Sequence, residues 1–308
     1  MRIVIADVIE SSLEEMLVNA GFDCVNLCKS TDDAFLSELY KAEGLVIRSR
    51  MPITPEIIDR CERLKFIGRV GAGLEHIATD YARSKGISIL SSPEGNRQAV
   101  AEHALGSLLS LFNHLSRSNA QVREGLWLRK DNEGIELQGK TVGIIGVGNT
   151  GSAFAKVVSG FGVEILGYDK YKSGYEHEAT MEEVFEKADV VSLHLPMTEE
   201  LFELVNADWI SKFKKPFYLI NTARGHLIKI PDLLDALDSG KVLGACLDVL
   251  PYETERLKMP EIESLPEDAH RLFQHEKVLL TPHTAGLTKE SYGKLSSILA
   301  EKIIAQFG

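Results

Sequence analysis

The stretch TVGIIGVGNTGSAFAKVV, residues 141–158, decides the fold. It opens with a short apolar run typical of a buried strand, turns through several glycines and continues with the spacing of an amphipathic helix. Gly146, Gly148 and Gly151 stand in the GxGxxG spacing that lets backbone amides approach a pyrophosphate closely. Strand, turn and helix in this order predict a βα unit of a parallel sheet, with a phosphate site at the helix N-terminus.

The alternation of short apolar runs and amphipathic segments extends from this unit in both directions. Toward the C-terminus, strands are expected at residues 163–166, 190–193, 218–220, 245–249 and 278–280. Toward the N-terminus, a separate series is expected at residues 3–6, 24–27, 45–47, 66–67 and 87–90. The pattern predicts an α/β protein with two doubly wound parallel-sheet domains.

The domain boundaries follow from two helical segments. A wide apolar stripe over residues 97–112 predicts a long buried helix after the first series. The segment 289–307 is helical by pattern and has no strand after it, so we expect it to return to the first domain. The predicted domains are therefore residues 1–97 with 287–308, and residues 98–286.

One connection is longer than those usual between such elements. Residues 250–276 are polar and contain several prolines, which predicts a functional loop or a surface excursion.

Composition excludes several classes of protein. The 308 residues are 44% hydrophobic and 26% charged, with a net charge of -11, and no apolar stretch approaches the roughly 20 residues of a membrane helix. A negative chain of this kind is not expected to bind nucleic acid. The N-terminus enters a strand without a signal peptide, so we expect a cytoplasmic protein that does not bind membranes. The four cysteines lack zinc-site spacing, and no metal is expected.

An acidic residue strengthens the nucleotide signal. Asp169 ends the apolar run after the glycine turn, where a carboxylate binds a ribose diol and repels a 2'-phosphate. We expect Asn149 and Thr150, inside the turn, to contribute as well. NAD is favoured over NADP, although Lys170 and Lys172 weaken that argument. The alternative is a glycine turn beside a solvated aspartate.

Chemically active side chains follow the remaining strands of the second domain. They are His194, Arg224, Asp248, Glu253 and His283, which the carboxyl edge of a parallel sheet brings together. Arginine binds a carboxylate through two parallel hydrogen bonds, and histidine exchanges a proton near neutral pH. A carboxylate on the far ring nitrogen would support the charged histidine. The set suits a 2-hydroxy acid, although each residue could instead be structural.

Several strings occur together in a known order: VIRSR (46–50), RVGAGLEHI (69–77), VAEHAL (100–105), GIIGVGNTG, HLPMT, NTARG, LDV and TPHTAG. With them the chain resembles the D-2-hydroxyacid dehydrogenases over nearly its whole length. The resemblance implies a flavodoxin-like substrate domain and a Rossmann dinucleotide-binding domain, with the active site in the cleft between them, and assembly as a homodimer.

The resemblance also implies residue roles. The catalytic residues would be Arg224, Glu253 and His283. Asp248 would hold the nicotinamide carboxamide of NAD, and the remaining cofactor-binding residues would include His194, Pro196 and Thr222. Backbone amides of the first domain would grip the substrate carboxylate, namely those of Val70, Gly71, Ala72 and Gly73.

One departure concerns the catalytic acid. A proline usually follows it in the family, whereas Thr254 follows Glu253 here, and Glu255 is the alternative acid.

The substrate is the least determined part of the prediction. Arg48, Ser49 and Arg50 resemble the phosphate-binding segment of family members that act on 3-phosphoglycerate in serine biosynthesis, and Arg129 could add charge. The alternative is a set of solvated or ion-paired arginines. Glyoxylate or hydroxypyruvate reduction, and an NAD-sensing corepressor, are the other functions considered. Because the sequence stops at Gly308, no C-terminal regulatory domain is expected.

Overall fold

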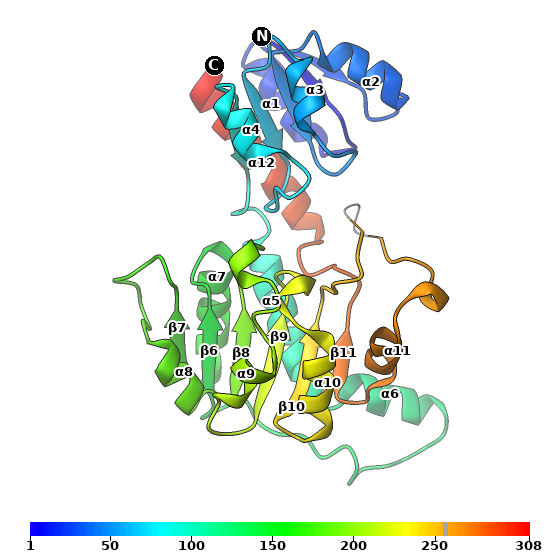
Figure 1. Ribbon diagram of the computed structural model, residues 1–308, viewed down its shortest axis with the longest axis vertical. Coiled ribbons are helices and arrows are strands. Elements are labelled where there is room, and N and C mark those ends of the chain that lie inside the picture. Colours follow the sequence, from blue (N-terminus) through cyan, green and yellow to red (C-terminus); the bar gives the residue numbers. More distant parts are fainter. Residues whose placement is uncertain (255–257) are drawn as a thin grey trace. The chain divides into compact units, whose positions relative to one another are not determined.

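A computed structural model describes residues 1–254 and 258–308 of the chain. It divides into two compact units, Met1–Arg97 with Leu287–Gly308, and Gln98–Gly286. Each unit is built on one parallel sheet with helices on both faces (Figure 1). The α/β class predicted from the sequence is confirmed.

The first unit has the strand order β2-β1-β3-β4-β5, which is the flavodoxin-like order. Its strands are β1 (Arg2–Ile5), β2 (Asp23–Asn26), β3 (Gly44–Ile47), β4 (Phe66–Arg69) and β5 (Ser88–Ser91). Its helices are α1 (Ser11–Asn19), α2 (Asp32–Leu39), α3 (Pro55–Asp59), α4 (Thr79–Ser84) and α12 (Lys289–Phe307).

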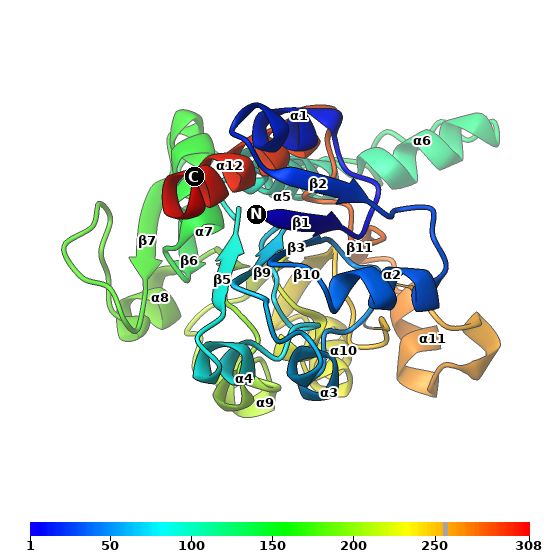
Figure 2. The same cartoon turned by 90° about the horizontal axis from the view of Figure 1, so that it is seen from above.

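Alternate residues of these strands face two separate cores. Val4 and Leu45 pack toward α2, α3 and α4, whereas Ile3 and Val46 pack toward α1 and α12. Figure 2 shows α1 and α12 together on one side of this sheet. Helix α12 packs on α1 and belongs to the first unit, which is where we expected the last helix to lie.

The second unit has the strand order β11-β10-β9-β8-β6-β7, all parallel. Its strands are β6 (Thr141–Ile145), β7 (Glu164–Tyr168), β8 (Val190–Leu193), β9 (Phe217–Asn221), β10 (Val242–Leu247) and β11 (Val278–Leu280). Its α-helices are α5 (Arg97–Phe112, of which Arg97 belongs to the first unit), α6 (Leu115–Arg123), α7 (Asn149–Val158), α8 (Met181–Lys187), α9 (Ala207–Ser211), α10 (Ile230–Asp238) and α11 (Glu267–Gln274). The order reverses between β6 and β8, and in such sheets ligands bind at the carboxyl ends of the strands beside the reversal.

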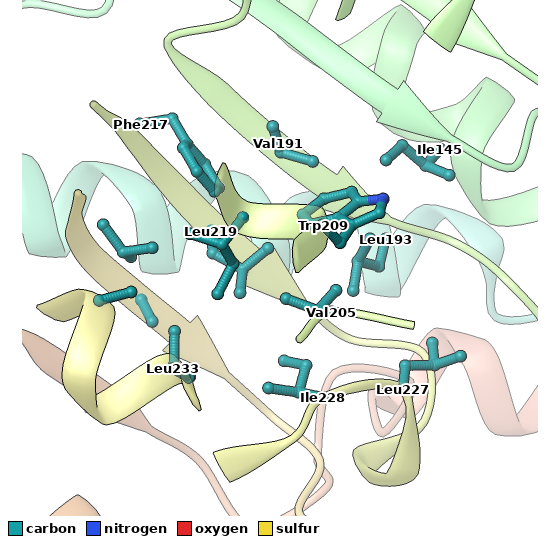
Figure 3. Packing of buried hydrophobic residues seen from close by; sticks show 14 of the residues in the cluster. Ile145, Val191, Leu193, Val205, Trp209, Phe217, Leu219, Leu227, Ile228 and Leu233 are labelled. Atoms are coloured by element: carbon teal, nitrogen blue, oxygen red, sulfur yellow. The ribbon is translucent and has the colours of Figure 1, made fainter. Parts of the chain in front are cut away.

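Two buried cores hold this sheet in place. Val191, Leu193 and Leu219 face the core that includes Trp209 and Leu233 of the helices α9 and α10 (Figure 3). Residues of alternate position in the same strands face α5 and α7 on the other side. The strand ends are therefore fixed by packing on both faces, which gives the loops that follow them a rigid base.

The structure corrects the prediction for residues 250–276. This segment contains the 3-10 turn Ile262–Ser264 and the helix α11, whose Ala269 and Leu272 are buried. It is therefore partly an ordered, packed element rather than only a polar loop. Within residues 1–254 and 258–308, no helix is both long and apolar enough to cross a membrane.

Candidate active site

The turn between β6 and α7 is built for close backbone approach. Gly146 has φ +92°, and a Cβ there would lie 2.4 Å from the carbonyl oxygen of His194. At Gly151 a Cβ would lie 2.0 Å from the carbonyl oxygen of Gly146, whereas at Gly148 it would meet nothing within 4 Å. Gly148 caps α7 without a side-chain hydrogen bond, so the first amides of this helix suit a phosphate group.

Asp169 lies beside the same turn, at the end of β7. Its carboxylate accepts hydrogen bonds from the amides of Val147 (2.9 Å) and Tyr171 (3.0 Å). Lys172 donates to the carbonyl oxygen of Val147 (3.2 Å), while Lys170 pairs with Glu200. The carboxylate predicted to bind a ribose is thus fixed against the glycine turn.

His194 connects β8 to this turn. Its Nε2 lies 2.9 Å from the Ser192 hydroxyl and its Nδ1 lies 3.3 Å from the hydroxyl of Thr150. Burial lowers the pKa of the His194 imidazole to about 3, so the ring is neutral near physiological pH. The structure places Thr150 and His194 in contact, which their separate positions in the sequence did not indicate.

Two further residues named for the cofactor lie on the same strand edge. Pro196 is exposed in the segment after β8, and Thr222 follows β9 directly. The Thr222 hydroxyl is buried and has no hydrogen-bond partner within the described part of the chain. A buried, unsatisfied hydroxyl is costly, and a bound ligand that hydrogen-bonds to it would remove that cost.

His283 and Glu253 form a hydrogen-bonded pair. His283 Nδ1 lies 2.6 Å from Glu253 Oε2, and the other carboxylate oxygen accepts from the amide of Leu250 (2.7 Å). A cavity of about 340 Å³ adjoins the pair and includes Met259 and Phe273 in its lining. The alternative acid, Glu255, lies outside the described residues.

Arg224 lies in the turn that follows β9. The Asn221 side chain shapes this turn, donating to the carbonyl oxygen of Arg224 (2.8 Å) and accepting from the amide of Ala223 (3.0 Å). A Cβ on Gly225 would lie 2.0 Å from the carbonyl carbon of Leu250. The Arg224 turn therefore packs directly on the turn that leads to Glu253.

Asp248 is 3% exposed at the end of β10. Its carboxylate accepts from the hydroxyl of Thr281 (2.6 Å) and from the amides of Thr284 (2.8 Å) and Ala285 (2.9 Å). Thr281 also contacts His103 of α5. Neither Thr281 nor His103 had a predicted role, although His103 lies in the string VAEHAL and Thr281 in TPHTAG.

The predicted substrate-binding residues lie in the first unit. Asp7 accepts hydrogen bonds from the amides of Arg48 (2.6 Å) and Ser49 (3.3 Å). The Arg48 guanidinium lies over the ring of Tyr292, 4.7 Å from its centroid. The Arg48 Nη2 also donates to the Tyr292 hydroxyl at 3.5 Å.

The loop after β4 is only partly free to bind a ligand through its backbone. The amide of Val70 donates to the carbonyl oxygen of Ile47, and the amide of Gly71 donates to that of Arg69. The predicted amide contacts to a carboxylate therefore fall to Ala72 and Gly73 rather than to all four residues.

Arg50 is a structural residue, which corrects its assignment to phosphate binding. Its guanidinium bonds to Asp32 and to three carbonyl oxygens, those of Ala6, Leu27 and Ser30. Its side chain is 10% exposed. Because all its donors serve the fold, the ion-paired alternative holds for this residue.

Comparisons with known proteins agree with this geometry. Residues 105–285 match the model of the D-isomer specific 2-hydroxyacid dehydrogenase, NAD binding domain. The chain is 32% identical over 311 residues to a hydroxypyruvate reductase of Thermotoga maritima, covering 100% of this chain and 98% of that protein. It is also 32% identical over 309 residues to a D-3-phosphoglycerate dehydrogenase of Bacillus subtilis, covering 98% of this chain and 56% of that protein.

The chain thus spans about half the length of the curated phosphoglycerate dehydrogenases that it matches. Among solved structures, a D-lactate dehydrogenase of Aquifex aeolicus complexed with NAD and lactic acid is 28% identical, with a TM-score of 0.81. That match covers 99% of this chain and 95% of the other.

Proposed function

The chain belongs to the D-isomer specific 2-hydroxyacid dehydrogenase family, and we propose that it is an NAD-dependent oxidoreductase that interconverts a small 2-keto acid and its D-2-hydroxy acid. The observation that carries the proposal is the 2.6 Å contact between His283 and Glu253. His283 follows β11, and β11 belongs to the same sheet as β6, the strand that leads into the glycine turn.

The cofactor fits the turn described above. NADH would bind with its pyrophosphate at the N-terminus of α7 and a ribose at Asp169, and it supplies the hydride when bound. Asp169 repels a 2'-phosphate, which favours NAD over NADP. Thr222 offers its buried hydroxyl, and Asp248 remains a proposed contact of the carboxamide.

The chain's own residues handle the proton and the substrate. His283 holds a proton on Nε2 for the carbonyl oxygen, while Glu253 accepts from Nδ1 and stabilises the charged ring. Arg224 binds the substrate carboxylate through its planar guanidinium and polarises the neighbouring carbonyl.

Steady-state reduction of a panel of 2-keto acids with NADH and with NADPH tests this function. His283→Ala should lower kcat by roughly 10²- to 10⁴-fold, because the proton donor is lost, while NADH affinity is retained. Arg224→Ala should also raise KM, because the carboxylate loses its partner. Near-normal kcat in His283→Ala, or no reduction of any 2-keto acid by the wild type, would overturn the proposal.

Arg48 and Ser49 carry the proposal of a phosphorylated substrate, 3-phosphohydroxypyruvate, which would place the enzyme in serine biosynthesis. The support is the Arg48 guanidinium, whereas the nearby carboxylate of Asp7 opposes an anion. A higher kcat/KM for 3-phosphohydroxypyruvate than for hydroxypyruvate, lost in Arg48→Ala, is expected. Equal values that Arg48→Ala leaves unchanged would refute the phosphorylated substrate.

Homodimer formation is also proposed, and its support is α6 with the loop that follows. No residue of α6 is buried. Leu115, Val122, Leu126, Trp127, Leu128 and Ile135 are all exposed. In Figures 1 and 2 this segment stands away from the β6–β11 sheet, so that a second copy could cover its apolar side chains.

A further inference from the structure

The backbone of His283 is held in an unfavourable conformation. Its φ is +53°, in the left-handed region that residues other than glycine rarely adopt. Its amide donates to the carbonyl oxygens of Asp248 (2.8 Å) and Thr281 (3.0 Å). The next two amides, of Thr284 and Ala285, donate to the Asp248 carboxylate. Asp248 therefore supports the backbone conformation that directs His283.

A carboxylate as buried as that of Asp248 requires compensating donors. Two backbone amides provide part of this compensation, and the hydroxyl of Thr281 adds a third donor at 2.6 Å. The imidazole of His103 contacts the Thr281 hydroxyl, and its Nε2 lies 3.6 Å from Asp248 Oδ1. His103 comes from α5, so a separate helix contributes to the solvation of this charge.

The direction of the hydrogen bonds can be assigned. A carboxylate only accepts, so Thr281 must donate its single hydroxyl proton to Asp248. The Thr281 oxygen is then left as an acceptor toward His103 Nε2, at 3.0 Å. His103 must therefore carry a proton on Nε2 and donate it to Thr281. The relay runs from His103 through Thr281 to Asp248.

We propose that His103 is a positioning residue for the proton donor His283. Its N–H, acting through Thr281, stabilises the buried carboxylate of Asp248. That carboxylate fixes the backbone of residues 283–285 and thereby keeps the His283 side chain in contact with Glu253. The inference rests on the proposed function, because it assigns His103 to the same reaction. All the contacts involved lie within residues 98–286.

Paired substitutions separate hydrogen bonding from packing. Thr281→Val keeps the shape of the side chain and removes its hydroxyl, whereas Thr281→Ser keeps the hydroxyl. His103→Leu removes the donor, whereas His103→Gln places an amide N–H near the position of Nε2. We expect Thr281→Val and His103→Leu to lower kcat by roughly 10- to 100-fold, the cost of a small misplacement of a reacting group. Thr281→Ser and His103→Gln should retain most of kcat.

The double variant tests whether the two residues act in one relay. His103→Leu combined with Thr281→Val should be no slower than Thr281→Val alone, because each substitution breaks the same path. Additive losses would overturn the relay. Equal losses in His103→Leu and His103→Gln would also overturn it, because packing rather than the donor would then be responsible.

Hydrogen exchange of the Thr284 and Ala285 amides gives a readout that does not depend on activity. Both amides should exchange faster in Thr281→Val and His103→Leu than in the wild type, Thr281→Ser or His103→Gln. Unchanged exchange in Thr281→Val and His103→Leu would refute the inference. If the wild type reduces no 2-keto acid but the variants show the expected exchange pattern, the proposed function alone is refuted.

Discussion

His194 is a buried histidine that the fold keeps neutral. Its ring lies between the hydroxyls of Ser192 and Thr150. A neutral imidazole has one donor and one acceptor nitrogen, which suits two hydroxyl partners. Burial lowers the pKa of the ring from its ordinary value of 6.5 to about 3. The histidine therefore holds Thr150, at the start of α7, without placing a positive charge in the core.

This pKa shift predicts a pH-dependent stability. Below pH 6.5 the unfolded chain binds a proton on His194 that the folded protein does not bind until about pH 3. The stability that His194 contributes is complete above pH 6.5 and falls as the pH is lowered, by about 2 kcal/mol between pH 6.5 and 5. Urea unfolding of the wild type and His194→Gln over this range should show a shallower pH dependence in the variant. Parallel curves would mean that the folded protein protonates this ring.

Glu253 and Glu255 offer a matched pair of substitutions. Glu253 contacts His283 Nδ1 at 2.6 Å. In Glu253→Gln the His283 ring loses its negative partner, so kcat for reduction of a 2-keto acid should fall. Glu255→Gln should leave kcat unchanged. If only Glu255→Gln lowers kcat, the supporting acid is Glu255 instead.

At the scale of elements, two glycines of the turn between β6 and α7 have different roles: Gly151 is required by the fold, and Gly148 by the proposed cofactor site. A Cβ on Gly151 would lie 2.0 Å from the carbonyl oxygen of Gly146, whereas on Gly148 it would point into open space. Gly151→Ala should therefore destabilise the fold by about 1–3 kcal/mol, as overpacking does. Gly148→Ala should fold normally and lose NADH affinity, because its Cβ would occupy the space proposed for the pyrophosphate. Thermal unfolding and NADH fluorescence titration measure the two effects; equal affinity of Gly148→Ala and wild type would contradict the proposed site.

The predictability of the elements depended on burial. Each strand predicted from the sequence is present. The clearest of them, β3, β6 and β8, are buried on both faces and read as continuous apolar runs. The helices α6 and α11 were missed. None of the side chains of α6 is buried, and α11 buries only Ala269 and Leu272. Helix α6 therefore has no buried stripe, and α11 spans only 8 residues, fewer than the roughly 11 or more over which periodicity is read.

The site was predictable to the extent that it follows strand ends. His283 and Glu253 were paired in the prediction because the carboxyl edge of a parallel sheet collects functional side chains, and the structure places the two side chains in contact. His103 was missed because it contacts Thr281 across 178 residues of sequence, from the middle of a helix. Such a contact depends on how α5 packs on the sheet, and no local pattern encodes it.

At the scale of the whole molecule, the exposed apolar segment of α6 and its loop predicts self-association. Trp127 is 77% exposed, and a soluble monomer rarely presents several such side chains together. Sedimentation velocity should give the wild type a mass twice the 34.0 kDa of the chain. A C2 interface uses the same patch on both subunits, so each substitution there acts twice.

Leu128 and Leu243 provide the matched test, because both leucines are 40% exposed and only Leu128 lies in this segment. Because Leu128 is 40% exposed in the subunit, Leu128→Lys loses at most about 1 kcal/mol of apolar burial per subunit, and it also introduces two unpaired charges into the interface. Its dimer dissociation constant should therefore rise by roughly 100-fold or more, while Leu243→Lys should leave it unchanged. A wild type that sediments as a monomer at every concentration, or equal association of the two variants, would show that this segment does not form the interface. Reductase activity measured alongside would then tell whether an isolated subunit is sufficient for the reaction.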